Sequence, residues 1–455
     1  MKKKLKISVR VLRVRVKSRM KVLDVEKNIG IKAFITPFNG IGGKLRTVPE
    51  DFVVYEVSSY PPKVEDGKYA IAKVTAVYWE TNLLIRELSK ELHISRQRIG
   101  FAGTKDKRAK TTRLMSFYNI PLETLSNVKL RNVIIEEIYR SDRPVRIGDL
   151  FGNKFEIIIR NLSQDVKLEH VEKIASYITS YGGFPNFFGV QRFGIVRPIS
   201  HIVGKHIIKG DFEKAVMSYI ANPMEGEDKE IFVLRKKLQE TRDYAEALKS
   251  YPFSLYFEKA VLNKLVSNPS GFVDALKVLP RNLLTMFVYS YQSYLFNKVL
   301  SERIRKGIPL NEAIVGDIVY PIRGGVIEER CIKVKKSNLE KVNKQVSKGK
   351  GVVTGLLFGY DPVFSDGEMG EIEHSVIESE KVNPRDFIVP DIPFVSSSGS
   401  RRALLASVKR LDFKLIDDEM NQGKQALFLK FELNKGCYAT CLLREFMKAD
   451  DIRNY

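Results

Sequence analysis

Features that define many classes of protein are scarce in this chain of 455 residues. It holds three cysteines, Cys331, Cys437 and Cys441, and none of them forms a CxxC pair, so they cannot build a disulfide framework. The last two are interpreted as structural thiols of a protein in a reducing cytoplasm. The five histidines are scattered, and His201 and His206 lack nearby acidic or cysteine partners. The sequence therefore predicts no disulfide scaffold and no metal site.

Long hydrophobic runs and nucleotide-binding signatures are missing as well. The most apolar long segment, residues 283–300, is interrupted by polar side chains and falls short of the roughly 18 apolar residues of a membrane span. Residues 40–43 do not match GxGxxG, and the glycine before Lys110 is wrongly spaced for a phosphate-binding P-loop. These absences exclude a membrane-spanning protein, a nicotinamide cofactor and a nucleoside-triphosphate site.

Acidic residues are fewer than basic ones. Lys and Arg total 76 against 54 Asp and Glu, which gives a net charge of +22 and a pI near 9.6. Such a basic balance favours a polyanionic partner, and nucleic acid is the first candidate. Ten of the first 23 residues are Lys or Arg and none is acidic, which predicts a basic arm over residues 1–23. The alternative is that Met20 is the true start and the arm is an artefact.

The most informative segment is residues 101–107, Phe-Ala-Gly-Thr-Lys-Asp-Lys. It places Asp106 between two lysines in a glycine-containing turn that follows a short apolar run. Neighbouring cations favour the charged form of a carboxylate, so Asp106 is expected to be ionised and available as a nucleophile. The alternative is a surface turn of mixed charge.

A second segment, residues 184–194, interleaves phenylalanines with Asn, Gln and Arg between glycines. Aromatic faces can stack bases, and amide or guanidinium groups can bind base edges and phosphates. The alternative is an aromatic loop that anchors two domains.

Local patterns predict strands and helices in the first 195 residues and longer helices afterwards. Strands are expected at residues 52–57, 99–102 and 155–159, and helices at 165–181 and after an N-cap at Thr81-Asn82. Residues 200–310 are expected to be helical, most strongly at 283–305, and residues 314–365 to form a small β element. The acidic stretch 366–380 is interpreted as a solvated loop, and residues 426–433 and 436–440 as strand-like.

Seven short motifs follow one another along the chain: residues 49–52 with Glu56, 103–107, 152–155, 186–194, 291–295, 399–402, and 436–440 running to 444–445. In this order they resemble the tRNA pseudouridine synthase D (TruD) family in its larger archaeal or eukaryote-like form. The resemblance runs from about residue 29 to residue 448. It implies an isomerase that converts uridine to pseudouridine in tRNA, at position 13 first and at position 35 as the alternative.

The resemblance also implies a mechanism and a set of site residues. Asp106 falls on the family's catalytic aspartate, which starts cleavage of the N-glycosidic bond by attacking C1′ or by assisting elimination, without metal or organic cofactor. Phe52 and Tyr438 match positions that border the uracil, Asn186 matches a residue that contacts the target nucleotide, and Phe188 lies on the same loop. The implied supporting residues are Arg46, Glu56 and Lys105. Lys110 and Arg113 depart from the family pattern by adding positive charge, which bears on the choice of uridine.

The expected fold is α+β. Residues 24–195 and 400–455 are expected to form a catalytic domain with a central mixed or antiparallel sheet flanked by helices, and residues 196–399 a mainly helical insertion with a small β portion. The expected partner is tRNA, with precursor tRNA or another RNA as alternatives, in the cytoplasm. A non-catalytic RNA-binding module is the competing function. A methyltransferase or a nuclease is disfavoured because neither a glycine-rich cofactor loop nor clustered carboxylates are evident.

Overall fold

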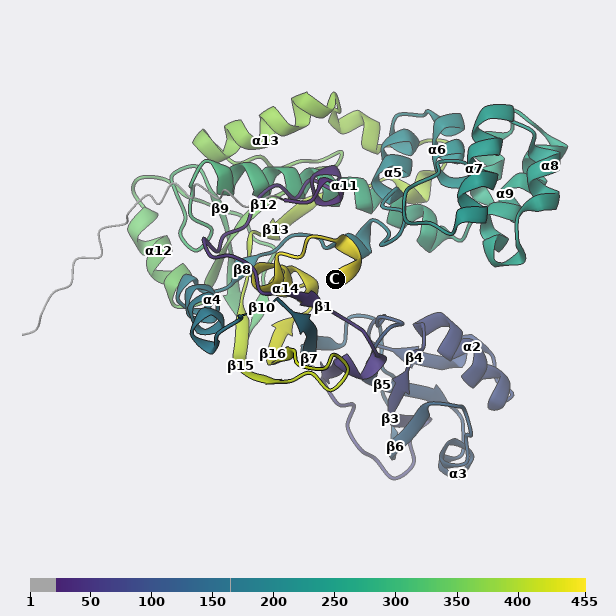
Figure 1. Ribbon diagram of the computed structural model, residues 1–455, viewed down its shortest axis with the longest axis horizontal. Coiled ribbons are helices and arrows are strands. Elements are labelled where there is room, and N and C mark those ends of the chain that lie inside the picture. Colours follow the sequence, from purple (N-terminus) through teal and green to yellow (C-terminus); the bar gives the residue numbers. More distant parts are fainter. Residues whose placement is uncertain (1–21, 164) are drawn as a thin grey trace, which may run out of the picture. The chain divides into compact units, whose positions relative to one another are not determined.

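A computed structural model describes residues 22–163 and 165–455, which form two compact units (Figure 1). In the described part of the chain, the helical unit comprises residues 22–37 and 187–405, and the sheet unit comprises residues 38–163, 165–186 and 406–455. Each unit is thus assembled from segments that are far apart in the sequence. Apart from its last two residues, the basic arm predicted for residues 1–23 lies outside the described residues.

The sheet unit is built on a mixed sheet of nine strands. Its strands are β1 (Gly42–Lys44), β2 (Phe52–Ser58), β3 (Tyr69–Val77), β4 (Ile99–Phe101), β5 (Lys110–Tyr118), β6 (Val133–Ser141), β7 (Leu150–Leu162), β15 (Val408–Asp417) and β16 (Gln425–Asn434). The order is β15-β16-β7-β2-β5-β3-β6, with β1 on β7 and β4 on β5. Only β2 and β5 run parallel among these pairs of described strands. The C-terminal hairpin β15-β16 therefore completes a sheet that residues 42–162 begin.

Helices and short segments accompany this sheet. They are η1 (Pro49–Asp51), α2 (Thr81–Glu91), η2 (Arg96–Arg98), α3 (Leu122–Ser126), α4 (Leu168–Tyr181), β8 (Phe184–Pro185), α14 (Ala439–Met447) and η7 (Ile452–Asn454). The apolar face of α2 buries Leu84 and Leu88 in a core with β3 and β5. The N-cap of α2 is Glu80 rather than Thr81-Asn82, because the Glu80 carboxylate accepts hydrogen bonds from the first free backbone N–H groups.

The helical unit is centred on one long helix. Its helices are α1 (Asp24–Asn28), α5 (Ser200–Ile208), α6 (Phe212–Ile220), α7 (Lys229–Thr241), α8 (Tyr244–Ser250), α9 (Tyr256–Ser267), α10 (Phe272–Lys277), α11 (Arg281–Arg305), α12 (Leu339–Ser347) and α13 (Gly367–Glu380), with 3-10 turns η3 (Val190–Arg192), η4 (Phe253–Leu255), η5 (Pro384–Phe387) and η6 (Pro393–Val395). Helix α11 packs against α5, α13 and β12 (Figure 1). Because it contacts neighbours on several sides, α11 buries polar as well as apolar side chains.

A five-stranded sheet packs beside α11. Its strands are β9 (Ile318–Arg323), β10 (Val326–Ile327), β11 (Ile332–Lys333), β12 (Gly351–Leu357) and β13 (Ser400–Ala403). They are ordered β10-β9-β12-β13, with β11 on β9. Strand β14 (Leu405–Ala406) lies where the chain passes back to the sheet unit. The expected helical stretch and small β element are both confirmed.

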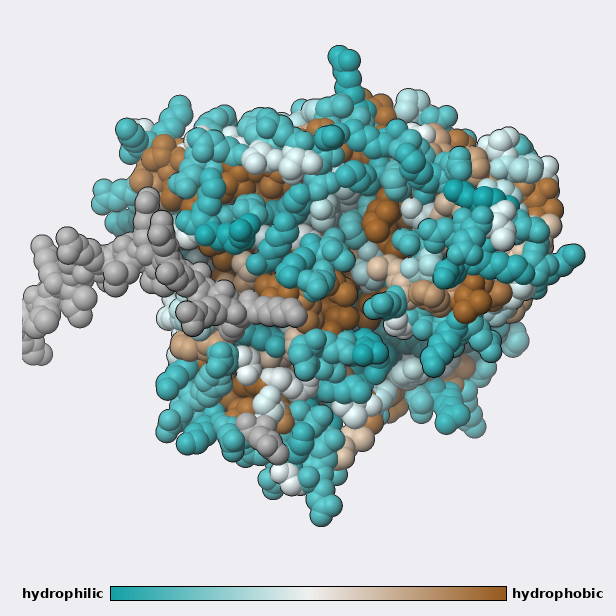
Figure 2. Space-filling model, turned by 45° about the horizontal axis from the view of Figure 1, so that its top comes forward, coloured by the Kyte–Doolittle hydropathy of each residue, from teal (hydrophilic) through white to brown (hydrophobic). Residues whose placement is uncertain are grey.

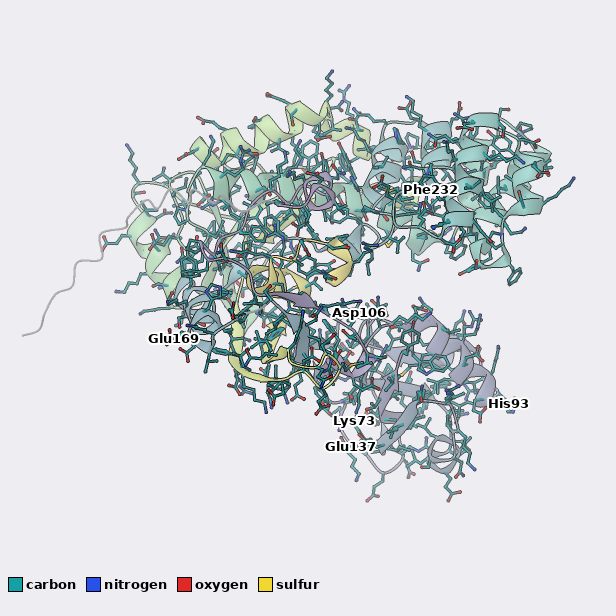
Figure 3. The ribbon with its side chains drawn as sticks, viewed as in Figure 1. Lys73, His93, Asp106, Glu137, Glu169 and Phe232 are labelled. Carbon is teal, nitrogen blue, oxygen red and sulfur yellow. The ribbon has the colours of Figure 1, made fainter. Side chains whose placement is uncertain are left out.

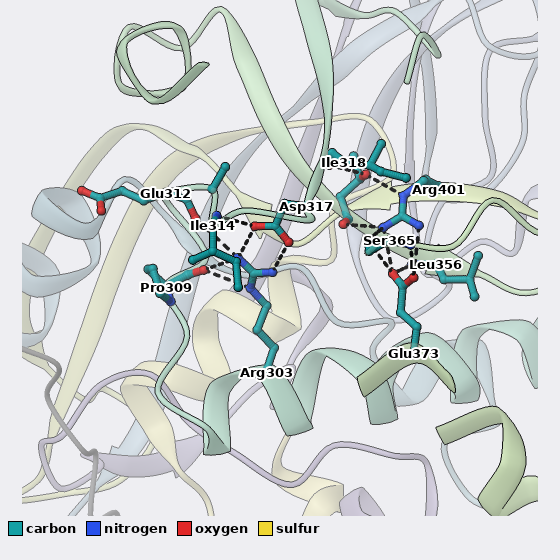
Figure 4. A network of polar contacts seen from close by, with 12 residues as sticks. Arg303, Pro309, Glu312, Ile314, Asp317, Ile318, Leu356, Ser365, Glu373 and Arg401 are labelled. Atoms are coloured by element: carbon teal, nitrogen blue, oxygen red, sulfur yellow. Dashed lines mark hydrogen bonds and ion pairs between the residues drawn. The ribbon is translucent and has the colours of Figure 1, made fainter. Parts of the chain in front are cut away.

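The acidic stretch was wrongly interpreted as a solvated loop. Residues 367–380 form helix α13, whose Glu373 is fully buried and lies 2.8 Å from the guanidinium Nη2 of Arg401 on β13 (Figure 4). A second buried pair, Arg303 with Asp317 at 2.6 Å, ties the end of α11 to the segment before β9 (Figure 4). A buried carboxylate needs such a partner to offset its lost hydration, and for Glu373 that partner, Arg401, lies 28 residues away in sequence.

Two strand predictions also need correction. Strand β7 spans residues 150–162, not 155–159, because Gly152 lets β16 approach closely: a Cβ there would lie 2.0 Å from the carbonyl oxygen of Leu433. Residues 436–440 are not a strand, since Tyr438 is the N-cap of α14. The predicted strands at 52–57, 99–102 and 426–433 are confirmed by β2, β4 and β16, to within one residue at each end.

Hydrophilic side chains cover most of the face seen in Figure 2, as a high content of charged residues requires. Across residues 22–163 and 165–455, helices long and apolar enough to cross a membrane are absent.

Candidate active site

Asp106 lies in the loop that joins β4 to β5 in the sheet unit (Figure 3). Its carboxylate Oδ2 is 3.1 Å from Nη2 of Arg46. The two partners differ in exposure: the side chain of Asp106 is 48% exposed, whereas that of Arg46 is 6% exposed. The carboxylate is therefore open to a ligand while its counter-ion is held inside the protein.

Several contacts fix Arg46. The preceding residue, Leu45, donates its N–H to the carbonyl of Asn454 at 2.7 Å, and Arg108 donates to the carbonyl of Arg46 at 2.9 Å. The guanidinium carbon lies 4.0 Å from the centroid of the Phe52 ring, a cation–π contact. Burial lowers the pKa of Arg46, while the charge of Asp106 and their hydrogen bond raise it. The other terminal nitrogen, Nη1, is buried without a hydrogen-bond partner in the described part of the chain.

Lys105 and Glu56 form a second ion pair behind the loop. Lys105 Nζ lies 2.5 Å from Glu56 Oε2, and the two side chains are 4% and 1% exposed. Burial lowers the pKa of Lys105, and the charge of Glu56 opposes this shift. Glu56 also accepts a hydrogen bond from Ser58 Oγ at 2.7 Å. The pair joins the loop to β2 and leaves Lys105 directed away from solvent.

The cation that pairs with Asp106 is thus not one of the two lysines beside it in sequence. Lys105 is paired with Glu56, and Lys107 Nζ lies 5.2 Å from the centroid of the Tyr78 ring. Arg46, 60 residues earlier, takes this place. Sequence reasoning named Arg46 only through the family resemblance, since no local pattern connects it with the loop.

Thr81 and Arg113 also anchor the loop. The sequence offered no sign of this role for Thr81, and it suggested that the charge of Arg113 bears on the choice of uridine. The N–H of Lys105 donates to Thr81 Oγ1 at 2.9 Å, and Arg113 Nη1 donates to the same oxygen at 2.9 Å. Arg113 is fully buried on β5, and burial lowers its pKa to about 10. The positive charge of Arg113 therefore supports the loop from inside the unit and does not lie on a surface that RNA could contact.

The segment before Phe52 has its own buried support. Arg160 Nε donates to Asp51 Oδ1 at 2.8 Å, and Arg160 Nη1 donates to Asp418 Oδ1 at 3.1 Å. Asp51 is fully buried at the end of η1, one residue before Phe52. This network ties η1, β7 and the end of β15 together and so fixes the start of β2.

The remaining predicted residues fall in two places. Asn186 is buried directly after β8, and Tyr438 caps α14, against which β8 packs, so both belong to the sheet unit. Phe188 belongs to the helical unit, where the guanidinium of Arg402 lies 4.1 Å from its ring centroid. Arg46, Phe52 and Asp106 form one contact cluster, with Glu56 and Lys105 as a second pair beside it.

This arrangement suits nucleophilic or proton-accepting chemistry. An exposed carboxylate with a fixed orientation can attack an electrophilic carbon or take a proton, and a buried guanidinium stabilises its charge without covering it. Among residues 22–163 and 165–455, groups of three or more His, Cys, Asp and Glu side chains placed to hold a metal ion are absent.

Several known proteins that are similar to this chain carry the same family name. The family model described as tRNA pseudouridine synthase D (TruD) matches residues 28–446. A curated protein of Methanococcoides burtonii named "Probable tRNA pseudouridine synthase D" is 43% identical over 436 residues, covering 95% of this chain and 99% of that protein. One of the same name from Thermococcus sibiricus is 37% identical over 425 residues, covering 91% and 97%. A crystal structure of the "Putative tRNA pseudouridine synthase D (TruD)" from Methanosarcina mazei matches with a TM-score of 0.83 at 40% identity, covering 96% of this chain and 100% of that one, and confirms the expected fold class.

Proposed function

The chain belongs to the tRNA pseudouridine synthase D (TruD) family, and on that premise we propose that it converts uridine 13 of tRNA to pseudouridine in the cytoplasm with Asp106 as the catalytic carboxylate. It is accordingly an isomerase that acts on tRNA. The proposed catalytic domain, residues 24–195 and 400–455, contains the whole described sheet unit, and residues 196–399 are the proposed insertion.

The contact between Arg46 and Asp106 is the observation that supports this assignment. Cleavage of the uridine N1–C1′ bond requires a carboxylate that is ionised, accessible and fixed. Asp106 is the exposed member of an ion pair whose cation is buried and held by backbone and ring contacts.

The reaction is an isomerisation, so its atoms balance without a co-reactant. The N1–C1′ bond breaks with participation of Asp106, the uracil turns, and a C5–C1′ bond forms. The C5 proton then leaves, and N1 gains one. In this scheme Phe52 holds Arg46 in place; its ring is only 1% exposed, so it supports the site from inside the unit instead of bordering the uracil as the resemblance implies. Tyr438 and Asn186 contact the target nucleotide, and Phe188 is a further substrate-binding residue. Glu56 and Lys105 position the loop that carries Asp106.

Tritium release from tRNA labelled at uridine C5 tests the assignment. Wild-type protein is expected to release tritium from transcripts with U13, and Asp106→Asn to release none while it still binds tRNA. Asp142→Asn, which changes an exposed carboxylate of the same unit, is the matched control and should retain activity.

The position is tested with transcripts in which either U13 or U35 is replaced by cytidine. Loss of release only with the U13 replacement supports the proposal, whereas loss only with the U35 replacement identifies the other position. Full activity of Asp106→Asn, or tight binding of tRNA by the wild type without release from any transcript, would contradict the catalytic assignment.

A further inference from the structure

The helical unit contains a pocket of about 270 Å³. It is lined by Leu357 and by residues of three segments far apart in sequence, 188–192, 289–293 and 397–400. Each overlaps or adjoins one of the short motifs at 186–194, 291–295 and 399–402. The tertiary structure thus gathers three separate motifs around one cavity. None of the described residues that line it is acidic, which suits an anionic ligand.

Arg192 brings unused hydrogen-bond donors to this pocket. Its Nε donates to Ser293 Oγ at 3.3 Å, whereas Nη1 and Nη2 have no hydrogen-bond partner in the described part of the chain. The guanidinium carbon lies 5.8 Å from the ring centroid of Phe188 and 6.0 Å from that of Tyr289. Two free terminal nitrogens in a planar fork match two oxygens of a phosphate.

Helix α11 holds the segment that carries Arg192. Ser290 Oγ donates to the carbonyl of Arg192 at 2.9 Å. Asn297 accepts a hydrogen bond from the N–H of Phe188 at 2.9 Å and donates one to its carbonyl at 3.0 Å. The backbone of residues 188–192 is therefore tied at both ends to buried polar groups of one helix. With the backbone held and Nε bonded to Ser293 Oγ, the Arg192 side chain has less conformational entropy to lose when it binds a ligand.

Gln292, also on α11, fixes another wall of the pocket. Its Nε2 donates to Ser397 Oγ at 3.0 Å and to the carbonyl of Phe358 at 2.7 Å. The exposed side chains of Ser398 and Ser400 follow, separated by Gly399 with a φ of 80°. A Cβ at Gly399 would lie 2.4 Å from the carbonyl oxygen of Leu357, so only glycine permits this loop. Serine hydroxyls are common donors to phosphate oxygens.

We propose that this pocket binds one nucleotide of a single-stranded segment of the tRNA, with a phosphate on Arg192 and the serine hydroxyls and a base on the ring of Tyr289. The tyrosine is 42% exposed and so offers a face for stacking. The volume lies just below the roughly 300–1,000 Å³ of pockets for whole small molecules, which suits one unit of a longer chain. This inference rests on the proposed function, because that function supplies tRNA as the ligand.

Salt dependence of tRNA binding tests the phosphate contact. The full chain and Arg192→Gln are compared over a range of salt concentrations. The variant is expected to bind about tenfold more weakly, and the slope of log K against log salt should fall by about 0.7, the value for one single-strand phosphate. Arg330→Gln removes the same charge from an exposed position of the helical unit and should leave both quantities near wild type. Equal losses in the two variants would overturn the proposal, because only net charge would then matter.

Neutral phosphate analogues supply a test that does not depend on folding of a variant. Single methylphosphonates are placed in turn along the single-stranded loops of the tRNA, and binding by wild type, Arg192→Lys and Arg192→Gln is measured. One position is expected to weaken binding by the wild type about tenfold and to have no further effect on Arg192→Gln, with Arg192→Lys intermediate. Additive losses at every position would overturn the proposal. Tritium release by the wild type is measured in parallel, so that failure of the pocket assignment and failure of the proposed function are distinguished.

Discussion

Lys105 Nζ lies 2.5 Å from Glu56 Oε2, although Lys105 is adjacent in sequence to Asp106. The backbone turns between the two residues, so one side chain is buried against β2 and the other faces solvent. A buried ion pair therefore sets the conformation of the loop that presents the carboxylate.

Replacing Arg46 should affect the reaction more than RNA binding. Arg46→Gln removes the buried charge that pairs with Asp106, and the single-turnover rate of pseudouridine formation is expected to fall by about 10²–10³-fold. Affinity for tRNA should change little, because Arg46 is only 6% exposed. Arg143→Gln is the exposed control in the same unit. An unchanged rate in Arg46→Gln would show that the ion pair does not contribute to catalysis.

Removing one partner of the Glu56–Lys105 pair should destabilise the protein. Glu56→Gln leaves the buried ammonium of Lys105 without its counter-ion, and a loss of about 3–5 kcal/mol in the free energy of unfolding is expected. Denaturant unfolding of the variant measures this loss. The double variant Glu56→Gln with Lys105→Met should recover part of it, since no unpaired charge remains. If the double variant is as unstable as the single one, the charge is not the cause.

His201 predicts a pH dependence of stability. It is buried between Phe193 and Tyr294, with Glu380 and Lys205 as neighbouring charges, and burial lowers its pKa from 6.5 to about 4. Below pH 6.5 the unfolded chain binds a proton that the folded protein does not bind until about pH 4. The contribution of neutral, buried His201 to the free energy of unfolding is therefore fully present above about pH 6.5. It is lost as the pH falls toward 4, by up to about 3 kcal/mol.

The measurement for His201 compares denaturant unfolding of the wild type and His201→Phe at several pH values. The stability difference between the two proteins should shift in favour of the variant between pH 6.5 and 4. A difference that stays constant over this range would contradict the assignment to His201.

Gly152 should not tolerate a side chain. Gly152→Ala places a Cβ 2.0 Å from the carbonyl oxygen of Leu433, so β16 must move away from β7, and a loss of about 1–3 kcal/mol or more is expected. Gly103→Ala is the matched comparison, since its Cβ would meet no atom closer than 3.6 Å and should cost less. Thermal unfolding measures the loss of stability in each variant, and equal losses in the two variants would argue against the packing explanation.

Local structure was predicted best where one short pattern decides it. The strand at 52–57 begins with buried Phe52 and Val54 alternating with the partly buried positions 53 and 55, and the helix after residue 80 has an apolar stripe at helical spacing. The stretch 366–380 was misjudged because its acidic composition indicates solvent exposure, whereas Arg401, close in space but distant in sequence, makes burial of Glu373 possible. Strand β7 was predicted too short because a glycine that usually marks a turn here permits close approach of β16.

The sequence by itself determined the basic character of the protein, the order of its motifs and the acidic residue at the centre of the proposed chemistry, because composition and short motifs are local properties. Only the tertiary structure decided which cation meets Asp106, which polar residues support its loop, and that three separate motifs line one pocket. The physical reason is that ion pairs and pockets depend on distances in space. Arg46 and Asp106 are 60 residues apart in sequence but 3.1 Å apart between charged atoms, and no local pattern encodes that proximity.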